Sequence, residues 1–182
     1  RLNSRGVRLL EGGTYDPGSH AFFVGSLGDG SVHRVDAATG TEEVFFAPTE
    51  AGTWWTLGMA VDEERRRLWV CAMDDRREQG ESPAYDGYVW AFDLETGERE
   101  AVFALDDAYA DGTCTDVAVA ADGTAYVTDR DFGIVYQVFI DSGASVFTSA
   151  EELEGGIVGQ NAAVVLPDQS ALKLTIARYY TP

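Results

Sequence analysis

The sequence predicts an all-β protein: a β-propeller made of four-stranded antiparallel blades, with about three and a half blades in the chain. The first observation is a repeat, because apolar triplets at residues 22–24, 68–70 and 125–127 begin 46 and 57 residues apart. These spacings are near the period of propeller blades, about 40 to 50 residues. The second observation is turn chemistry, since an Asp-bearing turn precedes each triplet and a Gly-bearing turn follows the next strand.

Each repeat contains four short apolar runs, which we interpret as the four strands of one blade. They lie at residues 13–15, 22–24, 31–35 and 43–46, at 59–61, 68–70, 88–92 and 101–103, and at 117–119, 125–127, 134–138 and 145–147. A fourth repeat begins with runs at residues 162–165 and 172–177. We therefore expect one propeller domain over residues 1–182, with repeats at about 9–50, 54–107 and 111–152 and an incomplete repeat at 153–182. The strand residues expected to be buried between blades are Phe23, Val24, Trp69, Val70, Tyr126 and Val127.

Composition and charge exclude several classes of partner. The chain has 182 residues, of which 45% are hydrophobic, so it is long and apolar enough for a sizeable core. Its net charge of −18 argues against nucleic acid and against an anionic membrane surface. No run approaches the roughly 18 apolar residues of a membrane span. We expect a soluble protein, either cytoplasmic or exported after the removal of a leader that the sequence does not contain.

The two cysteines are too few for a disulfide framework. Cys71 alternates with apolar neighbours in a strand, so we expect it to act as a small buried apolar side chain. Cys114 opens the first strand of the third repeat, but both histidines, His20 and His33, lie in the first repeat. A catalytic cysteine–histidine pair and a zinc site are therefore disfavoured.

Several stretches resemble one known family. "LLEGGTYDPGSHAFFVGSLGDGSVHRVDAATG", "GMAVDEERRRLWVCAMDD", "DGYVWAFDLETGE" and "TDVAVAADGTAYVTD" are similar to the senescence marker protein/gluconolactonase/luciferin-regenerating enzyme-like family. The resemblance covers about residues 9–180 and is greatest to the first half of the family's pattern. It implies a six-bladed β-propeller, twice the length of this chain, and several members are metal-dependent lactonases or esterases.

A candidate site follows from propeller geometry, in which the first strand of each blade lines the axial channel. Five residues before the turn that ends each first strand stand Glu11, Leu57, Thr115 and Asn161. The resemblance implies Glu, Asn, Asn and Asp at these positions in the metal-dependent members. Glu11 keeps its type, Asn161 and Thr115 replace the expected residues with weaker oxygen donors, and Leu57 cannot bind a metal.

The resemblance implies Glu11, Thr115 and Asn161 as metal ligands and a divalent cation as cofactor, Ca²⁺ ahead of Mg²⁺, Mn²⁺ or Zn²⁺. Ca²⁺ prefers six to eight oxygen ligands and several negative charges, which this ring does not supply. Asp116 is the candidate general base. Because side chains alternate along a strand, we expect only one of Thr115 and Asp116 to face the channel.

Two other features are candidate ligand contacts. Blade two carries the charged insertion "MDDRREQGESPAYDGY" between its second and third strands. It is either a lid over the channel, carrying Asp74, Asp75, Arg76 and Arg77, or an ordinary surface loop. Trp54 and Trp55 precede the first strand of blade two, where they either pack between blades or form the floor of a ligand pocket.

Two classes of function remain. One is a metal-dependent lactone or ester hydrolase, and the other is a non-catalytic propeller that binds a small molecule or a partner protein. Leu57 and Thr115 favour the second class. An incomplete ring leaves apolar blade faces uncovered, and two explanations are open. Either the chain self-associates, as a homodimer through blade one and the incomplete blade four, or it is a fragment of a longer protein that supplies the other blades.

Overall fold

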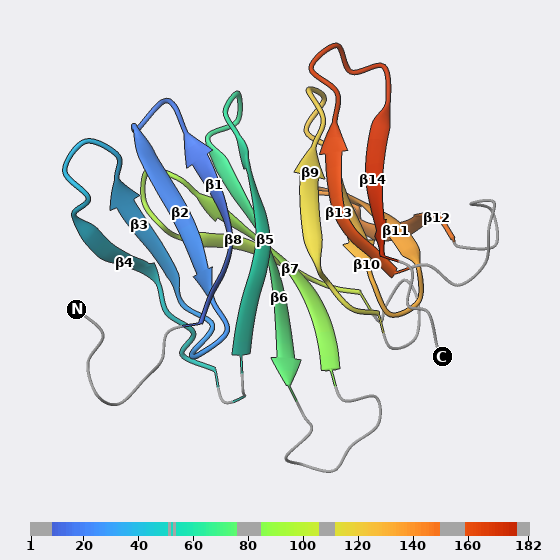
Figure 1. Cartoon of the computed structure of the whole chain (residues 1–182), viewed down its shortest axis with the longest axis horizontal. Coiled ribbons are helices and arrows are strands. Elements are labelled where there is room, and N and C mark those ends of the chain that lie inside the picture. The colour runs from blue at the N-terminus through green and yellow to red at the C-terminus, as the bar shows by residue number, and fades with distance from the viewer. Residues whose placement is uncertain are drawn as a thin grey trace.

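The computed structural model describes residues 9–50, 52, 54–75, 85–105, 112–149 and 159–177. These residues form strands and turns only (Figure 1). The strands are β1 (Leu10–Asp16), β2 (Ala21–Ser26), β3 (Val32–Asp36), β4 (Glu42–Phe46), β5 (Trp54–Asp62), β6 (Arg67–Asp75), β7 (Tyr85–Asp93), β8 (Arg99–Ala104), β9 (Asp116–Val119), β10 (Ala125–Asp129), β11 (Ile134–Phe139), β12 (Gly143–Thr148), β13 (Gly159–Val165) and β14 (Leu172–Ala177). No helix in these ranges has the length and apolar character that crossing a membrane requires.

The strands form successive antiparallel meanders. Three sheets have four strands each, in the orders β1-β2-β3-β4, β5-β6-β7-β8 and β9-β10-β11-β12, and a two-stranded sheet pairs β13 with β14. The first strands of neighbouring sheets pack against one another, β1 on β5, β5 on β9 and β9 on β13. Figure 1 shows the sheets side by side, as blades around a common axis. The predicted fold class, about three and a half blades of a β-propeller, is confirmed.

The turns explain why the chain reverses where it does. In the turn after β3, the carboxylate of Asp36 accepts hydrogen bonds from the amide and the hydroxyl of Thr39, at 2.7 and 2.8 Å. Asp93 repeats this after β7 with Thr96, at 2.7 and 3.0 Å. The glycine that ends each turn has a φ of 70° or 72°, a conformation that suits glycine.

The core lies between the blades, in two clusters. The cluster between blades one and two contains Phe23, Val32, Met59, Leu68, Val70, Ala72, Trp90, Phe92 and Leu94. The cluster between blades two and three contains Leu57, Trp69, Cys71, Met73, Val89, Ala91, Leu105, Cys114, Val117, Ala125, Val127, Ile134, Tyr136 and Val138. Blade two therefore buries one face against blade one and the other against blade three.

Four of the six residues expected between blades, Phe23, Trp69, Val70 and Val127, are fully buried. Val24 and Tyr126 are only partly buried. Val24 lies on the face of blade one that no other described blade covers. Tyr126 lies on the face of blade three that turns toward β13 and β14, and it packs edge-on against the exposed ring of Phe147.

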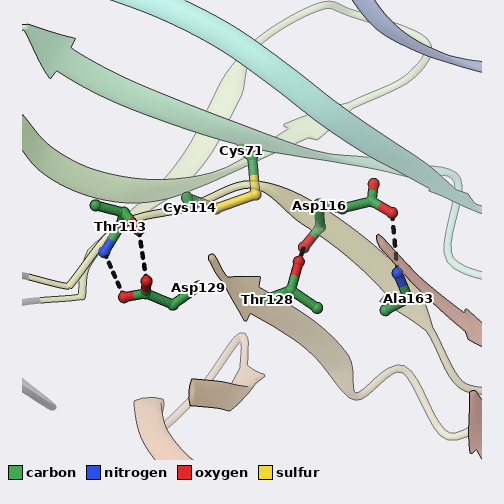
Figure 2. Close-up of a disulfide and its surroundings, with 7 residues drawn as sticks. All are labelled: Cys71, Thr113, Cys114, Asp116, Thr128, Asp129 and Ala163. Carbon is green, nitrogen blue, oxygen red and sulfur yellow. Dashed lines mark hydrogen bonds between the residues drawn. A yellow bond between two sulfur atoms is a disulfide. The ribbon is translucent and has the colours of Figure 1, made fainter. Parts of the chain in front are cut away.

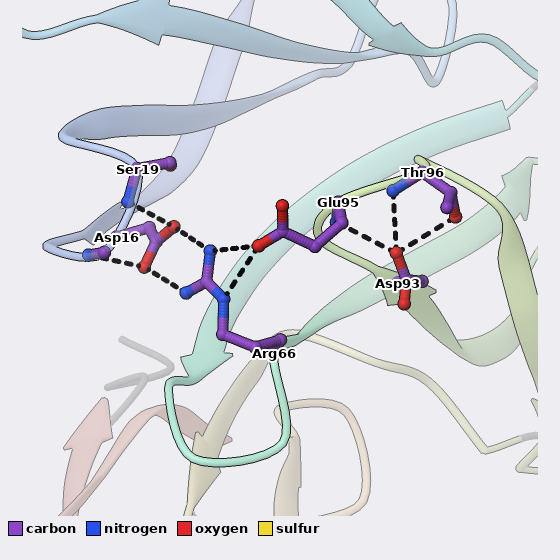
Figure 3. Close-up of polar contacts among 7 residues, drawn as sticks. Asp16, Ser19, Arg66, Asp93, Glu95 and Thr96 are labelled. Carbon is purple, nitrogen blue, oxygen red and sulfur yellow. Dashed lines mark hydrogen bonds and ion pairs between the residues drawn. The ribbon is translucent and has the colours of Figure 1, made fainter.

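An ion pair joins the first turns of blades one and two (Figure 3). The guanidinium of Arg66 donates two hydrogen bonds to the buried carboxylate of Asp16, at 2.8 and 2.9 Å, and also contacts Glu95. The amides of Gly18 and Ser19 donate to the same carboxylate. Hydrogen bonding to Arg66 holds the pKa of Asp16 well below its usual range.

Candidate functional site

The first strands of blades one, two and three line a pocket of about 540 Å³ at the propeller axis. Its lining consists of Glu11, Gly12, Leu27, Trp55, Leu57, Gly58, Thr115, Asp116 and Arg130. Three of the four predicted ring positions, Glu11, Leu57 and Thr115, therefore meet in one place. The fourth, Asn161, lies in β13, which packs against β9, but its side chain is outside the described part of the structure.

The ring positions coincide with irregularities in the first strands. Register shifts occur between Glu11 and Gly13 in β1, between Thr56 and Met59 in β5, and between Gln160 and Ala162 in β13. A β-bulge bends a strand and re-aims its side chains, and such bulges are common next to active sites. Gly12 has a φ of 66°, and a Cβ there would lie 2.1 Å from the carbonyl oxygen of Leu57. The close approach of β1 to β5 therefore requires a glycine at this position.

Asp116 lies between blades. Its Oδ2 accepts a hydrogen bond of 3.1 Å from the amide of Ala163 in β13. Burial raises the pKa of the Asp116 carboxyl. Both Thr115 and Asp116 contribute to the pocket lining, which differs from the expectation that only one would. The reason is that β9 begins at Asp116, so strand alternation does not apply to Thr115.

The described donors do not fit the divalent cation that the sequence resemblance implied. Glu11 contributes a carboxylate and Thr115 a hydroxyl, while Leu57 fills the position between them with an apolar side chain that is 5% exposed. No group of three or more His, Cys, Asp or Glu side chains that could hold a metal ion occurs within the described ranges. A hard cation such as Ca²⁺ needs six to eight oxygens.

A disulfide joins Cys71 of β6 to Cys114, two residues before β9 (Figure 2). The Cα atoms are 5.1 Å apart, and both residues are fully buried between blades two and three. The expectation that Cys71 acts only as a small apolar side chain was wrong. The available signal was that the chain's two cysteines stand in adjacent repeats, one in a central strand and one at the start of a first strand.

The disulfide is one of several contacts that fix residues 113–116, which include the ring residue Thr115 and the pocket acid Asp116. Thr113 donates from its amide and its hydroxyl to the buried carboxylate of Asp129, at 2.8 and 2.7 Å (Figure 2). The amide of Thr115 donates to the carbonyl of Thr128 at 2.8 Å. This wall of the pocket is therefore held by covalent and polar contacts at successive residues, as a preorganised site requires.

Trp54 and Trp55 lie in different surroundings, Trp54 between two blades and Trp55 at the axial pocket. Trp54 packs between blades one and two, with its ring 5.4 Å from that of Tyr88 and 5.2 Å from that of Trp90. Trp55 lines the axial pocket and packs against Tyr85 at 5.6 Å. Trp55 also packs against the core between blades two and three, so both tryptophans contact an inter-blade core and only Trp55 reaches the pocket.

The insertion in blade two was predicted to be either a lid over the channel or an ordinary surface loop. Asp74 and Asp75 extend β6 and pair with β7, so they belong to a sheet. Arg76 and Arg77, with the rest of the insertion up to residue 84, lie outside the described residues.

Besides the glycines Gly12 and Gly58, two pocket residues were not predicted from the sequence, Leu27 and Arg130. Each follows the second strand of its blade directly, so the two occupy equivalent positions in the repeats. Aligning the repeats one residue beyond each second strand would have identified both.

Comparisons with known proteins agree with this architecture. The Malassezia sympodialis allergen Mala s 1 superposes with a TM-score of 0.70 at 16% identity, over 96% of this chain and 60% of that one. Luciferin-regenerating enzyme superposes with a TM-score of 0.64 at 12% identity, over 92% and 53%. The β-propeller domain of Cps50 (Swd1) from Myceliophteria thermophila gives 0.55 at 17% identity, over 86% and 44%. At these identities the likeness shows the fold alone.

The chain spans about half the length of these structures, between 44% and 60%. No curated protein sequence matches it. The family model described as "SMP-30/Gluconolactonase/LRE-like region" matches residues 9–174, nearly the whole chain. The chain belongs to the SMP-30/gluconolactonase/LRE-like family.

Proposed function

We propose that this chain forms part of a gluconolactonase-like propeller whose axial pocket binds a small organic molecule without a catalytic metal. The observation that carries the proposal is Leu57, which stands in the ring between Glu11 and Thr115 and lines the pocket. An apolar side chain there removes one potential metal ligand from the ring. The pocket volume of about 540 Å³ lies within the range typical of small-molecule sites, about 300 to 1,000 Å³.

The experiment introduces, at positions 57 and 115, the asparagines that the resemblance implies for metal-dependent members of the family. We expect Ca²⁺, Mg²⁺, Mn²⁺ and Zn²⁺ each to leave the melting temperature of the wild-type chain unchanged. A double variant, Leu57→Asn with Thr115→Asn, should gain a Ca²⁺-dependent rise, because a ligand that binds the native state stabilises it. Leu57→Ala is the matched control, since it removes the leucine without adding an oxygen donor. A wild-type Ca²⁺ shift that Glu11→Gln abolishes would contradict the proposal.

The second candidate, a lactone or ester hydrolase, rests on Asp116. This carboxyl lines the same pocket as Glu11, and burial raises its pKa, which is the direction that general-base catalysis near neutral pH requires. In that role Asp116 would accept a proton from the attacking water. Turnover of a simple lactone that Asp116→Asn abolishes at unchanged melting temperature would favour this candidate over the first.

A further inference from the structure

We propose that the ligand of the axial pocket is a small zwitterion whose ammonium group binds Glu11 and whose carboxylate binds Arg130, with a short apolar chain between them. This inference rests on the proposed function, because it names the class of molecule that the pocket would hold. It uses the opposite charges on two sides of the pocket and the apolar wall that separates them.

The two charges come from different blades. Glu11 stands at the start of β1 in blade one, and Arg130 follows β10 in blade three. Strand β5 of blade two packs against both β1 and β9, so Leu57 and Trp55 lie between the charged residues. A molecule that reached both would need its charges separated by several bonds. For this reason an ω-amino acid fits better than an α-amino acid, whose charges lie on adjacent atoms.

The strand register places the two ends at nearby depths in the channel. Glu11 pairs with Gly25 in β2, and Thr128 in β10 pairs with Asp116 in β9. Arg130 follows Thr128 by two residues, so it lies near the start of β9, as Glu11 lies near the start of β1. The ligand would thus cross the channel rather than lie along it.

Glu11 is the acid best placed to receive an ammonium group. Its side chain is exposed to the pocket, and within the described part of the chain no hydrogen bond or ion pair engages its carboxylate. Asp116, the other pocket acid, already accepts a hydrogen bond from Ala163. An ammonium group carries three donors and binds a carboxylate best where few competing partners are present.

Arg130 retains donors for a carboxylate. Its Nε lies 3.5 Å from Asp131 Oδ1. The side chain of Arg130 is 34% exposed and that of Asp131 is 41% exposed. Exposed pairs of this kind are weak. The guanidinium has five N–H donors in a planar fork, so its terminal nitrogens match the two oxygens of a ligand carboxylate.

The apolar wall favours a methylene chain over a polar one. Leu27, Trp55 and Leu57 supply it, and Trp55 is held by its contact with Tyr85. A flat aromatic face beside aliphatic side chains buries CH₂ groups well, but it offers few partners for hydroxyls. A sugar-like polyol would leave most of its hydroxyls without hydrogen bonds against this wall.

The test uses a matched series of six-carbon probes with the whole chain. The probes are 6-aminohexanoate, hexanoate, hexylamine and 1,6-hexanediol, and the readouts are calorimetric titration and thermal shift. We expect 6-aminohexanoate to bind about 10-fold or more tightly than each of the others, since one hydrogen bond to a charged group accounts for about that factor.

Two variants assign each charge to its residue. Arg130→Gln should remove the advantage of 6-aminohexanoate over hexylamine, and Glu11→Gln should remove its advantage over hexanoate. A merely structural role would weaken all four probes together. Arg34→Gln, at an arginine that is equally exposed but outside the pocket, is the matched control and should change nothing.

The outcomes separate the two proposals. Equal binding of 1,6-hexanediol and 6-aminohexanoate, insensitive to both variants, would overturn the zwitterion and leave the pocket a binding site. Binding of hexanoate or hexylamine alone would overturn it likewise and identify the single charge that is recognised. If none of the four probes binds at millimolar concentration the zwitterion is excluded, and the metal experiment above then decides the proposed function by itself.

Discussion

Gly58 and Asp116 lie against each other at the propeller axis, so closely that a Cβ on Gly58 would stand 2.1 Å from Asp116 Oδ1. The other carboxylate oxygen of Asp116 accepts the hydrogen bond from Ala163. The amide of Gly58 donates to the carbonyl of Thr115 at 3.0 Å. The adjacent residues Thr115 and Asp116 therefore link blade three to blade two through a backbone hydrogen bond and to blade four through a carboxylate, and the absence of a side chain at Gly58 makes room for that carboxylate.

We expect Gly58→Ala to destabilise the protein more than a glycine replacement at an open turn. The added methyl must displace Asp116 or separate β5 from β9, and overpacking of this kind costs about 1 to 3 kcal/mol. Gly40→Ala is the control, because a Cβ there meets nothing within 4 Å and only the positive φ opposes it, at about 1 kcal/mol. Urea unfolding of both variants measures the difference. Equal losses would mean that the contact with Asp116 is not tight.

The disulfide between Cys71 and Cys114 should contribute substantially to stability. It closes a segment with a sequence separation of 43, for which loop-closure entropy gives about 4 kcal/mol. Thermal unfolding in dithiothreitol should therefore begin at a clearly lower temperature than in oxidising buffer. The double variant Cys71→Ala with Cys114→Ala is the control and should be insensitive to the reductant. Two titratable thiols in the unfolded, unreduced chain would show that the disulfide does not form.

The ion pair between Asp16 and Arg66 should make stability depend on pH in the acid range. Because Arg66 holds the pKa of Asp16 well below its usual range, the folded state binds the proton less readily than the unfolded state. The ion pair therefore stabilises the folded state fully above the pKa of aspartate in the unfolded chain, about 3.9. This stabilisation is lost progressively as the pH falls from there toward the pKa of Asp16 in the folded state.

Asp16→Asn should lower the free energy of unfolding by about 2 kcal/mol at pH 7. The difference in unfolding free energy between this variant and the wild type should become smaller as the pH falls from 5 to 2. Chemical unfolding at several pH values measures it. Glu43→Gln, which breaks the more exposed pair with Arg34, is the control and should change stability by about 0.5 kcal/mol or less. A gap that stays constant down to pH 2 would contradict the assignment to Asp16.

The sequence predicts the blades well, because each is local. Strand, turn and strand follow one another within a repeat, so triplets such as residues 68–70 and turns such as Asp93 to Thr96 can be read directly. Counting back from the turns also located Glu11, Leu57 and Thr115, since every blade enters the axis at the same repeat position.

Contacts between blades were harder to predict, because they depend on how whole sheets are set against each other. The disulfide joins Cys71 to Cys114 across two sheets, and nothing local to either residue marks its partner. Asp116 reaches Ala163 for the same reason. Arg130 was missed because its place in the pocket follows from equivalence with Leu27, which only a residue-by-residue alignment of the repeats shows.

Apolar side chains are exposed on the face of blade one that turns away from blade two. Phe22 is 46% exposed there, while the equivalent residues Leu68 in blade two and Ala125 in blade three are fully buried against a preceding blade. Tyr15 packs against Phe22, and Val44 on the same sheet is 56% exposed. The face thus has the composition of an inter-blade surface.

We propose that a second copy of this chain covers that face with its incomplete blade four, where β13 also exposes an apolar side chain, Val164, which is 53% exposed. Light scattering coupled to size exclusion should give twice the 19.7 kDa mass of one chain. Phe22→Asp should shift the mass to that of the monomer, because a charge in a buried apolar interface is strongly unfavourable. Val102→Asp is the matched control, since Val102 is 47% exposed on β8, away from this face, and the variant should remain dimeric. A wild-type chain that stays monomeric across a hundredfold range of concentration would show that no second copy covers blade one.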